Sequence, residues 1–405
     1  MSGAIKKTIY LDHAATTPLS QEVYEVMLPQ LRENYGNPSS IHHTGRRAFD
    51  TLQVARASLA TSLAVRPQEI IFTSGGTESD NLALLGFARA NLEHGNHIIV
   101  STIEHSAVLE AAHRLETEGF RVTYLPVDET GLVQLIELGN ALTDETILVS
   151  IMYANNEIGT IEPIADIAKL LAERYPSERK PILHTDACQA AGFLPITPNQ
   201  LGVDAMTINS AKIYGPKGIG LLYVKDGIAI LPTTVGGHQE LGRRAGTENI
   251  ALAIGFAKAL EKAVTEMAVT SSRLTVLRDH FLATLHELIP TIIVNGHPTK
   301  RLPNNIHVCV PDVEGEAMLL MLDEAGICAA TGSACNATDL LPSHVLRAIG
   351  RDENIIHGSL RFSLGKDTTV EDLDYTAETL ATVVSRLQKL SATPFINQSL
   401  YAKRT

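Results

Sequence analysis

The feature that most constrains the fold is an alternation, between residues 69 and 224, of short apolar runs with longer amphipathic stretches. The amphipathic stretches, such as Leu82–Leu92 and Ile164–Arg174, have the spacing of helices. The apolar runs are rich in β-branched residues and predict strands at Glu69–Thr73, His97–Ser101, Val122–Pro126, Ile147–Met152, Ile182–Thr185, Met206–Asn209 and Gly220–Val224. Strands that are apolar on both faces are typical of a mostly parallel sheet covered by helices on both sides. The pattern therefore predicts an α/β fold, whose ligands gather at the carboxyl ends of the strands.

The pattern changes after about residue 262. A helical stretch over Ala251–Leu288 leads into shorter elements, which are predicted strands at Thr291–Asn295, Asn305–Val310 and Ser359–Leu364 and a final helix at Val370–Leu390. These elements are typical of a smaller α+β domain. We predict a large domain over 15–262 and a small domain formed by 1–14 and 263–405, because 405 residues exceed one ordinary core.

Charge and composition argue against several classes of protein. A net charge of −12 disfavours a nucleic-acid-binding surface. No apolar run approaches the ~18–20 residues that cross a bilayer, and the start of the chain has no secretory apolar segment. The four cysteines have no paired spacing, which indicates a reducing compartment. We expect a cytoplasmic protein with no membrane partner, no direct nucleic-acid partner and no metal.

A lysine and an acid follow two successive predicted strands. Asp186 ends the strand at Ile182–Thr185, and Lys212 comes just after Met206–Asn209. Pyridoxal phosphate requires this pair, because a lysine binds its aldehyde and an acid keeps its ring nitrogen protonated. The two residues therefore predict a pyridoxal phosphate site.

A phosphate site is predicted where the strand at Glu69–Thr73 runs into Ser74-Gly75-Gly76-Thr77 and a helix follows. Glycines let the backbone approach an anion, and the N–H groups of a helix start can bind it. An ordinary glycine turn with an N-cap would have the same sequence.

Other polar residues at the strand ends could complete the site. His105 could stack on the cofactor ring and move a proton, although such a histidine is often a core or turn residue. Asn155 could contact the ring or the substrate, although Asn-Asn is often a turn, and Gln189 could reach the ring hydroxyl. Cys188 is expected to pack.

Three residues later in the chain point to a substrate and a second subunit. Cys335 lies among small polar residues, which suits a mobile thiolate or a half-buried structural cysteine. Arg361 lies in a predicted apolar strand, where it could bind a substrate carboxylate or form a structural salt bridge. Thr247 lies in the polar stretch 236–249, either a solvated loop or a loop that reaches a second subunit and contacts phosphate there.

With these residues in view, the chain resembles the class I cysteine desulfurases of the NifS/IscS type, within the class-V aminotransferase family. The resemblance runs almost end to end and is carried by motifs in the family's order, which are Tyr10-Leu11-Asp12-His13-Ala14-Ala15-Thr16-Thr17-Pro18, Gly36-Asn37-Pro38-Ser39-Ser40-Ile41-His42, Thr73-Ser74-Gly75-Gly76-Thr77-Glu78-Ser79-Asp80-Asn81, Asn155-Asn156-Glu157-Ile158-Gly159, Arg244-Ala245-Gly246-Thr247-Glu248-Asn249, Gly332-Ser333-Ala334-Cys335 and Pro342-Ser343-His344-Val345-Leu346-Arg347. It implies a fold-type I homodimer that converts L-cysteine to L-alanine. It also implies sulfur delivery, as a persulfide on Cys335, to an iron–sulfur scaffold or to tRNA-modifying proteins.

The resemblance also assigns roles by position. The implied catalytic residues are Lys212, Cys335 and His105. The implied cofactor contacts are Gly76, Thr77, His105, Asn155, Asp186, Gln189, Ser210, Lys212 and the partner subunit's Thr247. The implied substrate contacts are Asn155 and Arg361.

One departure from the family pattern is Ala211, where relatives commonly have a phosphate-binding histidine. Asn209 or Ser210 must then take over, or the phosphate has one contact fewer. The tail from Ala392 to Thr405 matches no docking motif. A selenocysteine lyase, a pyridoxal phosphate aminotransferase that does not need Cys335, and a sulfur-assembly binding module with weak activity remain alternatives.

Overall fold

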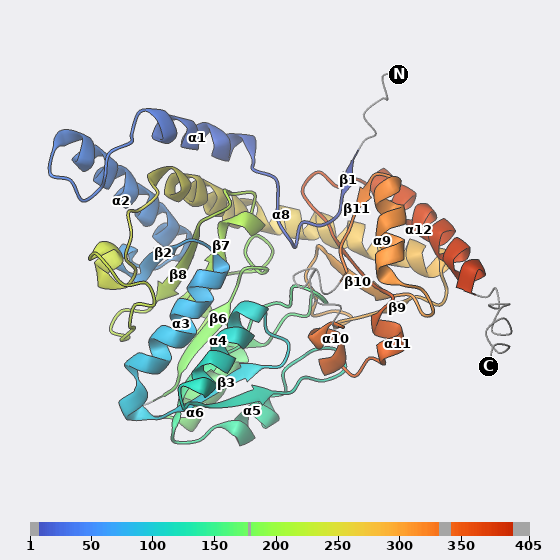
Figure 1. The fold of residues 1–405 in the computed structure, drawn as a ribbon, viewed down its shortest axis with the longest axis horizontal. Coiled ribbons are helices and arrows are strands. Elements are labelled where there is room, and N and C mark those ends of the chain that lie inside the picture. Colours follow the sequence, from blue (N-terminus) through green and yellow to red (C-terminus); the bar gives the residue numbers. More distant parts are fainter. Residues whose placement is uncertain (1–7, 177–179, 332–341, 392–405) are drawn as a thin grey trace, which may run out of the picture.

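The computed structural model describes residues 8–176, 180–331 and 342–391. Its centre is a seven-stranded sheet in the order β2-β8-β7-β6-β5-β3-β4 (Figure 1). The strands are β2 (Ile70–Thr73), β3 (His97–Ser101), β4 (Arg121–Leu125), β5 (Thr146–Ser150), β6 (Ile182–Asp186), β7 (Ala205–Asn209) and β8 (Gly220–Val224). All neighbours are parallel except β8, which is antiparallel to β2 and β7. The predicted α/β fold with a mostly parallel sheet is thereby confirmed.

Helices cover both faces of this sheet. The helices of this part are α1 (Gln21–Arg32), α2 (His43–Leu63), α3 (Gly76–Ala90), α4 (Ser106–Thr117), α5 (Leu135–Ala141), α6 (Ile164–Arg174) and α7 (Pro198–Leu201). Successive strand residues point to opposite faces, so Ile98 and Val100 pack with α3 and α4, whereas Ile99 packs with α2 and α6. Burial on both faces explains why the strands have continuous apolar runs. We call this part the large lobe.

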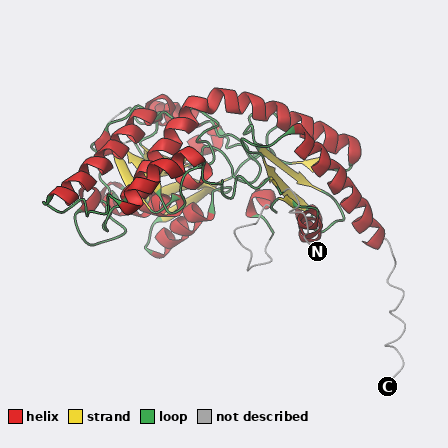
Figure 2. Ribbon diagram, turned by 90° about the horizontal axis from the view of Figure 1, so that it is seen from above, coloured by secondary structure: helices red, strands yellow, loops and turns green. Residues whose placement is uncertain are grey.

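A second sheet, in the order β12-β10-β9, forms the centre of what we call the small lobe. Its elements are β9 (Ile293–Val294), β10 (Asn305–Cys309), α9 (Gly315–Glu324), α10 (His344–Ala348), α11 (Glu353–Ile356), β12 (Ser359–Ser363) and α12 (Val370–Ser391). One face of β10 and β12 packs Ile306, Val308, Leu360 and Phe362 into an apolar core with α9 and α12. Figure 2 shows the two groups of strands, each flanked by helices.

The start of the chain joins the small lobe, because β1 (Ile9–Tyr10) pairs in parallel with β11 (Ile327–Cys328). Helix α8 (Ile250–Leu288) runs from one lobe into the other (Figure 1). Its first half contributes Phe256 to the large core and its second half contributes Phe281 to the small core. The division of the chain into domains at residue 262 remains a prediction. No helix of the described ranges is long and apolar enough to cross a bilayer.

Two elements differ from the prediction. Helix α3 begins at Gly76, six residues before the predicted Leu82. The prediction started too late because the buried residues of the first turns include the polar Ser79 and Asp80, which interrupt the apolar spacing. The strand predicted at Thr291–Asn295 is reduced to Ile293–Val294, since β10 pairs with those two residues alone.

Candidate active site

Lys212 and Asp186 come together at the carboxyl edge of the large sheet. Asp186 is the last residue of β6, and Lys212 ends the 3₁₀ turn η3 (Ser210–Lys212) that directly follows β7. The Asp186 Oδ1 atom accepts a hydrogen bond of 2.8 Å from the Cys188 N–H. The Ala14 carbonyl oxygen accepts hydrogen bonds from Lys212 and from Gln189, three residues after Asp186, which brings the two loops to one site.

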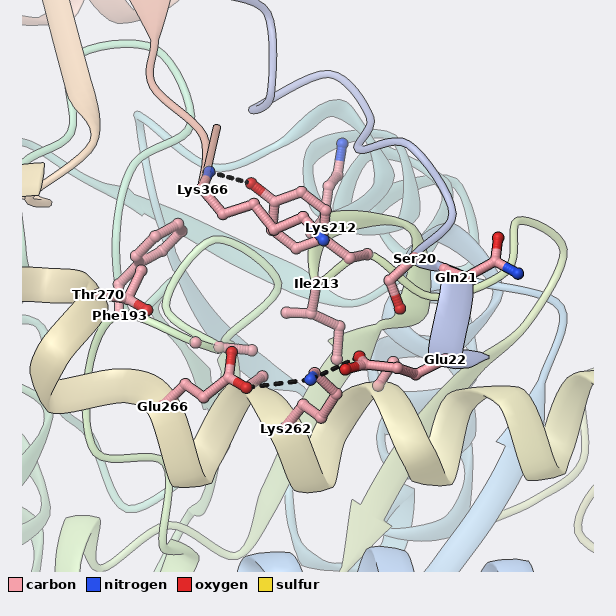
Figure 3. Close-up of a pocket in the computed structure, with 15 residues that line it drawn as sticks. Ser20, Gln21, Glu22, Phe193, Lys212, Ile213, Lys262, Glu266, Thr270 and Lys366 are labelled. Atoms are coloured by element: carbon pink, nitrogen blue, oxygen red, sulfur yellow. Dashed lines mark hydrogen bonds and ion pairs between the residues drawn. The ribbon is translucent and has the colours of Figure 1, made fainter. Parts of the chain in front are cut away.

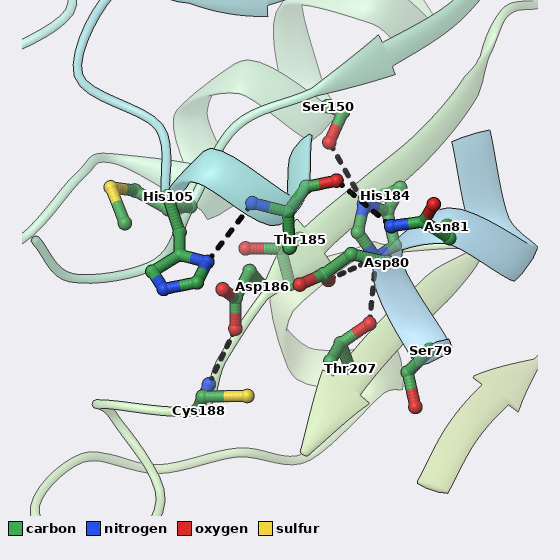
Figure 4. A network of polar contacts seen from close by, with 12 residues as sticks. Ser79, Asp80, Asn81, His105, Ser150, His184, Thr185, Asp186, Cys188 and Thr207 are labelled. Atoms are coloured by element: carbon green, nitrogen blue, oxygen red, sulfur yellow. Dashed lines mark hydrogen bonds and ion pairs between the residues drawn. The ribbon is translucent and has the colours of Figure 1, made fainter. Parts of the chain in front are cut away.

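His105 is held as a neutral ring beside Asp186 (Figure 4). It is the N-cap of α4, and its Nδ1 atom accepts a hydrogen bond of 3.1 Å from the Ala107 N–H. Burial lowers the pKa of His105, while the charge of Asp186 opposes this shift. A neutral ring whose Nδ1 accepts carries its proton on Nε2, so His105 can exchange a proton through that atom.

Three loops converge at the start of α3. A Cβ atom on Gly76 would lie 3.0 Å from the Cys188 Sγ atom and 3.5 Å from the Asn209 Nδ2 atom. The Ser210 Oγ atom is buried and has no hydrogen-bond partner among the described residues. A close backbone approach beside an unfilled hydroxyl suits a phosphate at a helix start. These residues therefore fit the predicted cofactor, with Thr77 exposed at the same helix start.

Gln189 and Asn155 have partners within the chain. The Gln189 amide donates to the Ala14 carbonyl oxygen at 2.9 Å. Asn155 is fully buried, its Oδ1 atom accepts from the N–H groups of Glu157 and Ile158, and its Nδ2 atom donates to the Ile103 carbonyl oxygen. In this arrangement Asn155 shapes the turn after β5, and its contact with a ring or substrate stays a prediction.

Arg361 occupies the middle of β12 and is 4% exposed. Its Nη2 atom pairs with the Asp12 Oδ1 atom at 2.9 Å, and its Nη1 atom donates to the Asn156 carbonyl oxygen at 3.1 Å. The salt bridge considered above as an alternative therefore exists. The Nε–H group, however, has no partner within the part of the chain that the structure describes, so Arg361 keeps a donor for a substrate carboxylate.

Sequence reasoning missed the N-terminal segment 12–17 as part of the site. The Ala14 carbonyl oxygen accepts from the Lys212 Nζ atom at 2.8 Å as well as from Gln189, and Ala15 accepts from Lys212 at 2.5 Å. Asp12 in the same segment holds Arg361. Only the family motif that begins at Tyr10 marked this segment, because contacts made by backbone carbonyls leave no side-chain signal.

Two buried carboxyls close to the site were also missed. Burial raises the pKa of Glu104 to about 8 and that of Glu157 to about 7. The Ser343 hydroxyl donates to the Glu157 Oε2 atom at 2.5 Å, and the Ser101 hydroxyl donates to the Glu104 Oε1 atom at 2.7 Å. Both glutamates follow predicted strands, and this position could have marked them as residues near the site.

The stretch 236–249 is anchored to the large lobe, which corrects the interpretation of a simple solvated loop. Glu240 is buried and accepts two hydrogen bonds from the Arg56 guanidinium and one from the Phe72 N–H. Arg244 pairs with Glu78 of α3 at 2.8 Å. Thr247 itself is exposed. Cys335, the predicted sulfur acceptor, lies outside the described residues.

A hollow of about 420 Å³ lies beside η3, between Tyr214, the start of α1 and the middle of α8 (Figure 3). In this view the Lys212 amine points away from the Lys262–Glu266 ion pair at the hollow. Because that amine reaches the segment 12–17 instead, its chemistry belongs to the region between the lobes that is bounded by Lys212, the segment 12–17 and Arg361, which we call the cleft.

Comparison with known proteins agrees with this geometry. A family model described as aminotransferase class-V matches residues 9–376. The chain is 50% identical over 387 residues to cysteine desulfurase IscS of Dictyoglomus turgidum, covering 96% of this chain and 97% of that protein. It is 48% identical over 385 residues to cysteine desulfurase IscS of Methanosarcina thermophila, covering 95% of this chain and 94% of that protein.

Solved structures give the same result. A NifS-like protein matches with a TM-score of 0.88 at 36% identity, covering 94% of this chain and 100% of that one. A structure of SspA in complex with cysteine matches with a TM-score of 0.77 at 35% identity, covering 88% of this chain and 99% of that one.

Proposed function

Because the chain belongs to the class-V aminotransferase family, we propose its activity from the residues that it brings to the family's site. It is a pyridoxal phosphate-dependent cysteine desulfurase that converts L-cysteine to L-alanine. The observation that carries the proposal is the convergence of Lys212, Asp186 and His105 at one sheet edge, with Arg361 linked to them through the segment 12–17.

The residues at the sheet edge fit the cofactor. Asp186 would pair with the ring nitrogen, His105 would stack on the ring, and Lys212 would hold the aldehyde carbon. The phosphate would lie against Gly76, Thr77 and Ser210, with Asn155 and Gln189 at the ring hydroxyl. When bound, pyridoxal phosphate supplies an electron sink for negative charge at the substrate α-carbon.

The chain's own residues then handle the substrate. The Arg361 Nε–H group binds the cysteine carboxylate, which fixes the position of the α-carbon. The Lys212 amine removes the α-proton, and the His105 Nε2 atom exchanges the proton of the substrate thiol. Burial in the cleft favours these transfers because it keeps His105 neutral.

The sulfur transfer balances without another reactant. The Cys335 thiolate attacks the substrate sulfur, forming a sulfur–sulfur bond while the carbon–sulfur bond breaks. The electron pair of the broken bond stays with the carbon skeleton, which takes up protons and leaves as alanine. Sulfur is thereby oxidised to the persulfide level, and the carbon is reduced.

A homodimer is part of the proposal. Large apolar side chains are exposed at Tyr35 (79%), Ile41 (90%), Val235 (82%) and Leu241 (72%). Exposed side chains of this size suit contacts with a second subunit, which would remove them from water. In that dimer the partner subunit's Thr247 joins the phosphate site.

The acceptor and the compartment are the remaining parts of the proposal. We propose that the persulfide passes to an iron–sulfur scaffold or to a tRNA-thiolation protein, in line with the IscS name of the relatives. A cytoplasmic location suits a cysteine that must stay reduced between turnovers.

The experiment that tests the activity mixes cofactor-loaded protein with L-cysteine and quantifies alanine together with the persulfide on Cys335 by mass spectrometry. Cys335→Ser should lose both products while keeping the cofactor absorbance. Cys328→Ser, on β11, is the matched control and should retain both. Alanine formed at the wild-type rate by Cys335→Ser would contradict the assigned sulfur transfer. A higher rate on selenocysteine than on cysteine would favour a selenocysteine lyase.

A further inference from the structure

Two buried titratable residues behind Asp186 have no part in the reaction described above. Asp80 lies in the first turns of α3 and is 1% exposed, and His184 lies fully buried on β6. His184 precedes Asp186 by two positions, so both side chains leave the strand on the same face. Figure 4 shows Asp80 next to His184, with Asp186 on the side toward His105. Asp80 therefore lies between helix α3, which begins at the proposed phosphate site, and Asp186, the proposed partner of the ring nitrogen.

Both nitrogens of the His184 ring already have hydroxyl partners. The Nδ1 atom lies 2.8 Å from the Ser150 Oγ atom, and the Nε2 atom lies 3.1 Å from the Thr207 Oγ1 atom. The Asp80 Oδ1 atom is 3.8 Å from Nε2, which is too long for a hydrogen bond. The contacts of His184 are thus complete without a charged ring.

The surroundings of Asp80 favour its protonated form. Burial raises the pKa of Asp80 well above its usual range, and the neighbouring charge of Asp186 adds to the shift. Burial lowers the pKa of His184 to about 4, so the ring does not supply a counter-charge at neutral pH. The Asp80 Oδ1 atom has no hydrogen-bond partner in the described ranges, and a bare buried carboxylate is far more costly than a bare carboxyl oxygen.

The other charged groups nearby lead to the same assignment. Glu104, whose charge also acts on Asp80, has a pKa raised to about 8 by burial and is itself protonated at neutral pH. His105 lies on the side of Asp186 away from Asp80 (Figure 4), and the charge of Lys212 acts on His105. Buried carboxyls whose charges act on one another do not all ionise, which favours a protonated Asp80 beside Asp186.

We propose that Asp80 is a positioning residue of the cofactor site, a protonated carboxyl that with His184 backs Asp186 and leaves it as the negative charge offered to the ring nitrogen. The proposal rests on the function given above, because only a ring nitrogen needs that charge. It adds a residue that touches neither cofactor nor substrate and acts through Asp186.

Infrared spectroscopy of cofactor-free protein tests the protonation directly. A protonated carboxyl has a carbonyl stretch that a carboxylate lacks, and the difference between wild type and Asp80→Asn isolates one such band from those of other buried acids. We expect Asp80→Asn to lose one acid band. The matched control is Asp204→Asn, since Asp204 is buried directly before β7 but ion-paired with Lys180 at 2.6 Å, and it should lose none. An unchanged acid region in Asp80→Asn would overturn the proposal even if the cofactor chemistry were correct.

The cofactor supplies the second readout. Apo-protein titrated with pyridoxal phosphate should give Asp80→Asn an affinity within about threefold of wild type, because a neutral amide replaces a neutral carboxyl of similar shape. Asp80→Ala leaves a cavity and removes one of the two hydrogen bonds of the Thr207 hydroxyl, so its affinity should fall about tenfold. The pH profile of the bound cofactor's absorbance should stay within a few tenths of a unit in Asp80→Asn. A displacement of one unit or more would mean that Asp80 had been charged, and equal affinities of the Asn and Ala variants would show that it positions nothing.

Thr207→Val offers an independent route if an Asp80 variant fails to fold. Removing this hydroxyl, which hydrogen-bonds to both His184 and the Asp80 carboxyl, should shift the frequency of the acid band without abolishing it. An acid band that does not move would contradict the proposed contact. If wild type failed to bind pyridoxal phosphate while the band behaved as expected, the function would fail and the protonation of Asp80 would stand.

Discussion

His184 in the large sheet and His307 in the small sheet are both buried, yet their rings are hydrogen-bonded to different degrees. Behind Asp186, both nitrogens of His184 have partners on neighbouring strands, Ser150 and Thr207. On the small sheet, His307 of β10 and Arg361 of β12 are cross-strand partners. The His307 Nε2 and Arg361 Nε atoms have no hydrogen-bond partner among the residues placed by the structure.

This difference suggests a division of labour between the lobes. Hydrogen bonds at both ring nitrogens keep His184 in one arrangement behind Asp186, which suits a group that remains bound through many turnovers. Unfilled donors on the small lobe suit a group that arrives and leaves, because a substrate carboxylate then satisfies a buried N–H that otherwise stays bare. The predictions below test this contrast in order of decreasing effect.

The largest effect is expected for Asp186→Asn, on the large lobe. The amide cannot hold the ring nitrogen in its protonated form, so turnover should fall by about 10²–10³-fold, as for loss of a preorganised charge. Single-turnover absorbance of the loaded variant with cysteine measures the step. A turnover rate of Asp186→Asn within threefold of wild type would contradict the proposed role of the large lobe.

Buried histidines on the two lobes should respond to acid in the same direction. Burial lowers the pKa of His307 to about 3, mainly by desolvation and then by the charge of Arg361, and lowers that of His184 to about 4. The unfolded chain therefore binds a proton below pH 6.5 that the folded chain excludes, so stability is full above pH 6.5 and is lost as the pH falls.

From pH 6.5 to 4.5 each histidine should cost about 2–3 kcal/mol of unfolding free energy. His307→Asn should remove that part of the acid loss, and His184→Asn is its matched counterpart on the large lobe. Urea unfolding at pH 7 and pH 4.5 gives the comparison. Equal acid losses in wild type and His307→Asn would contradict the neutral assignment of that ring.

Arg361→Lys should separate substrate binding from cofactor binding. A lysine cannot reproduce the planar donors, so KM for cysteine should rise about tenfold or more while kcat changes little. The affinity for pyridoxal phosphate should remain that of wild type, because Arg361 belongs to the small lobe. An equal fall in cofactor affinity would show that substrate binding and cofactor binding are not separated between the two lobes.

The smallest effect is expected for Ala211→His, which restores the residue common in relatives. Ala211 lies in η3 beside Ser210 and is partly exposed, so a larger side chain has room. A charge-assisted bond to phosphate should tighten cofactor binding up to about tenfold. Ala211→Leu adds bulk without a donor and should give no gain. No gain from histidine either would mean that Asn209 and Ser210 already satisfy the phosphate.

The sequence predicted the parts of the site that depend on strand ends. Lys212 and Asp186 could be paired because each follows a buried apolar strand, and parallel strands end at one edge. The partner of Arg361 could not be predicted, since Asp12 lies at the other end of the chain and meets it only through folding. Asp80 was hidden for another reason, because a polar residue in a helix start reads as solvated until burial is known.

The sequence was also silent about the backbone carbonyls of Ala14 and Ala15, which receive the Lys212 amine. Side-chain chemistry carries no trace of such acceptors, and their position depends on how β1 joins the small lobe. Long helices were easier to predict: α8 contains no proline, ends at the predicted Leu288 and begins at Ile250, one residue before the prediction.

Helix α8 has a consequence for how such a chain can change over time. It is one continuous rod that supplies Phe256 to one core and Phe281 to the other, and the small lobe also requires the first strand of the chain. The small lobe is therefore not a contiguous stretch, and the large lobe ends inside a continuous helix, so neither could be exchanged for another by recombination without cutting α8. The two halves of the cleft have to be inherited together, so a new substrate preference must come from point substitutions on the cleft faces and not from a borrowed module.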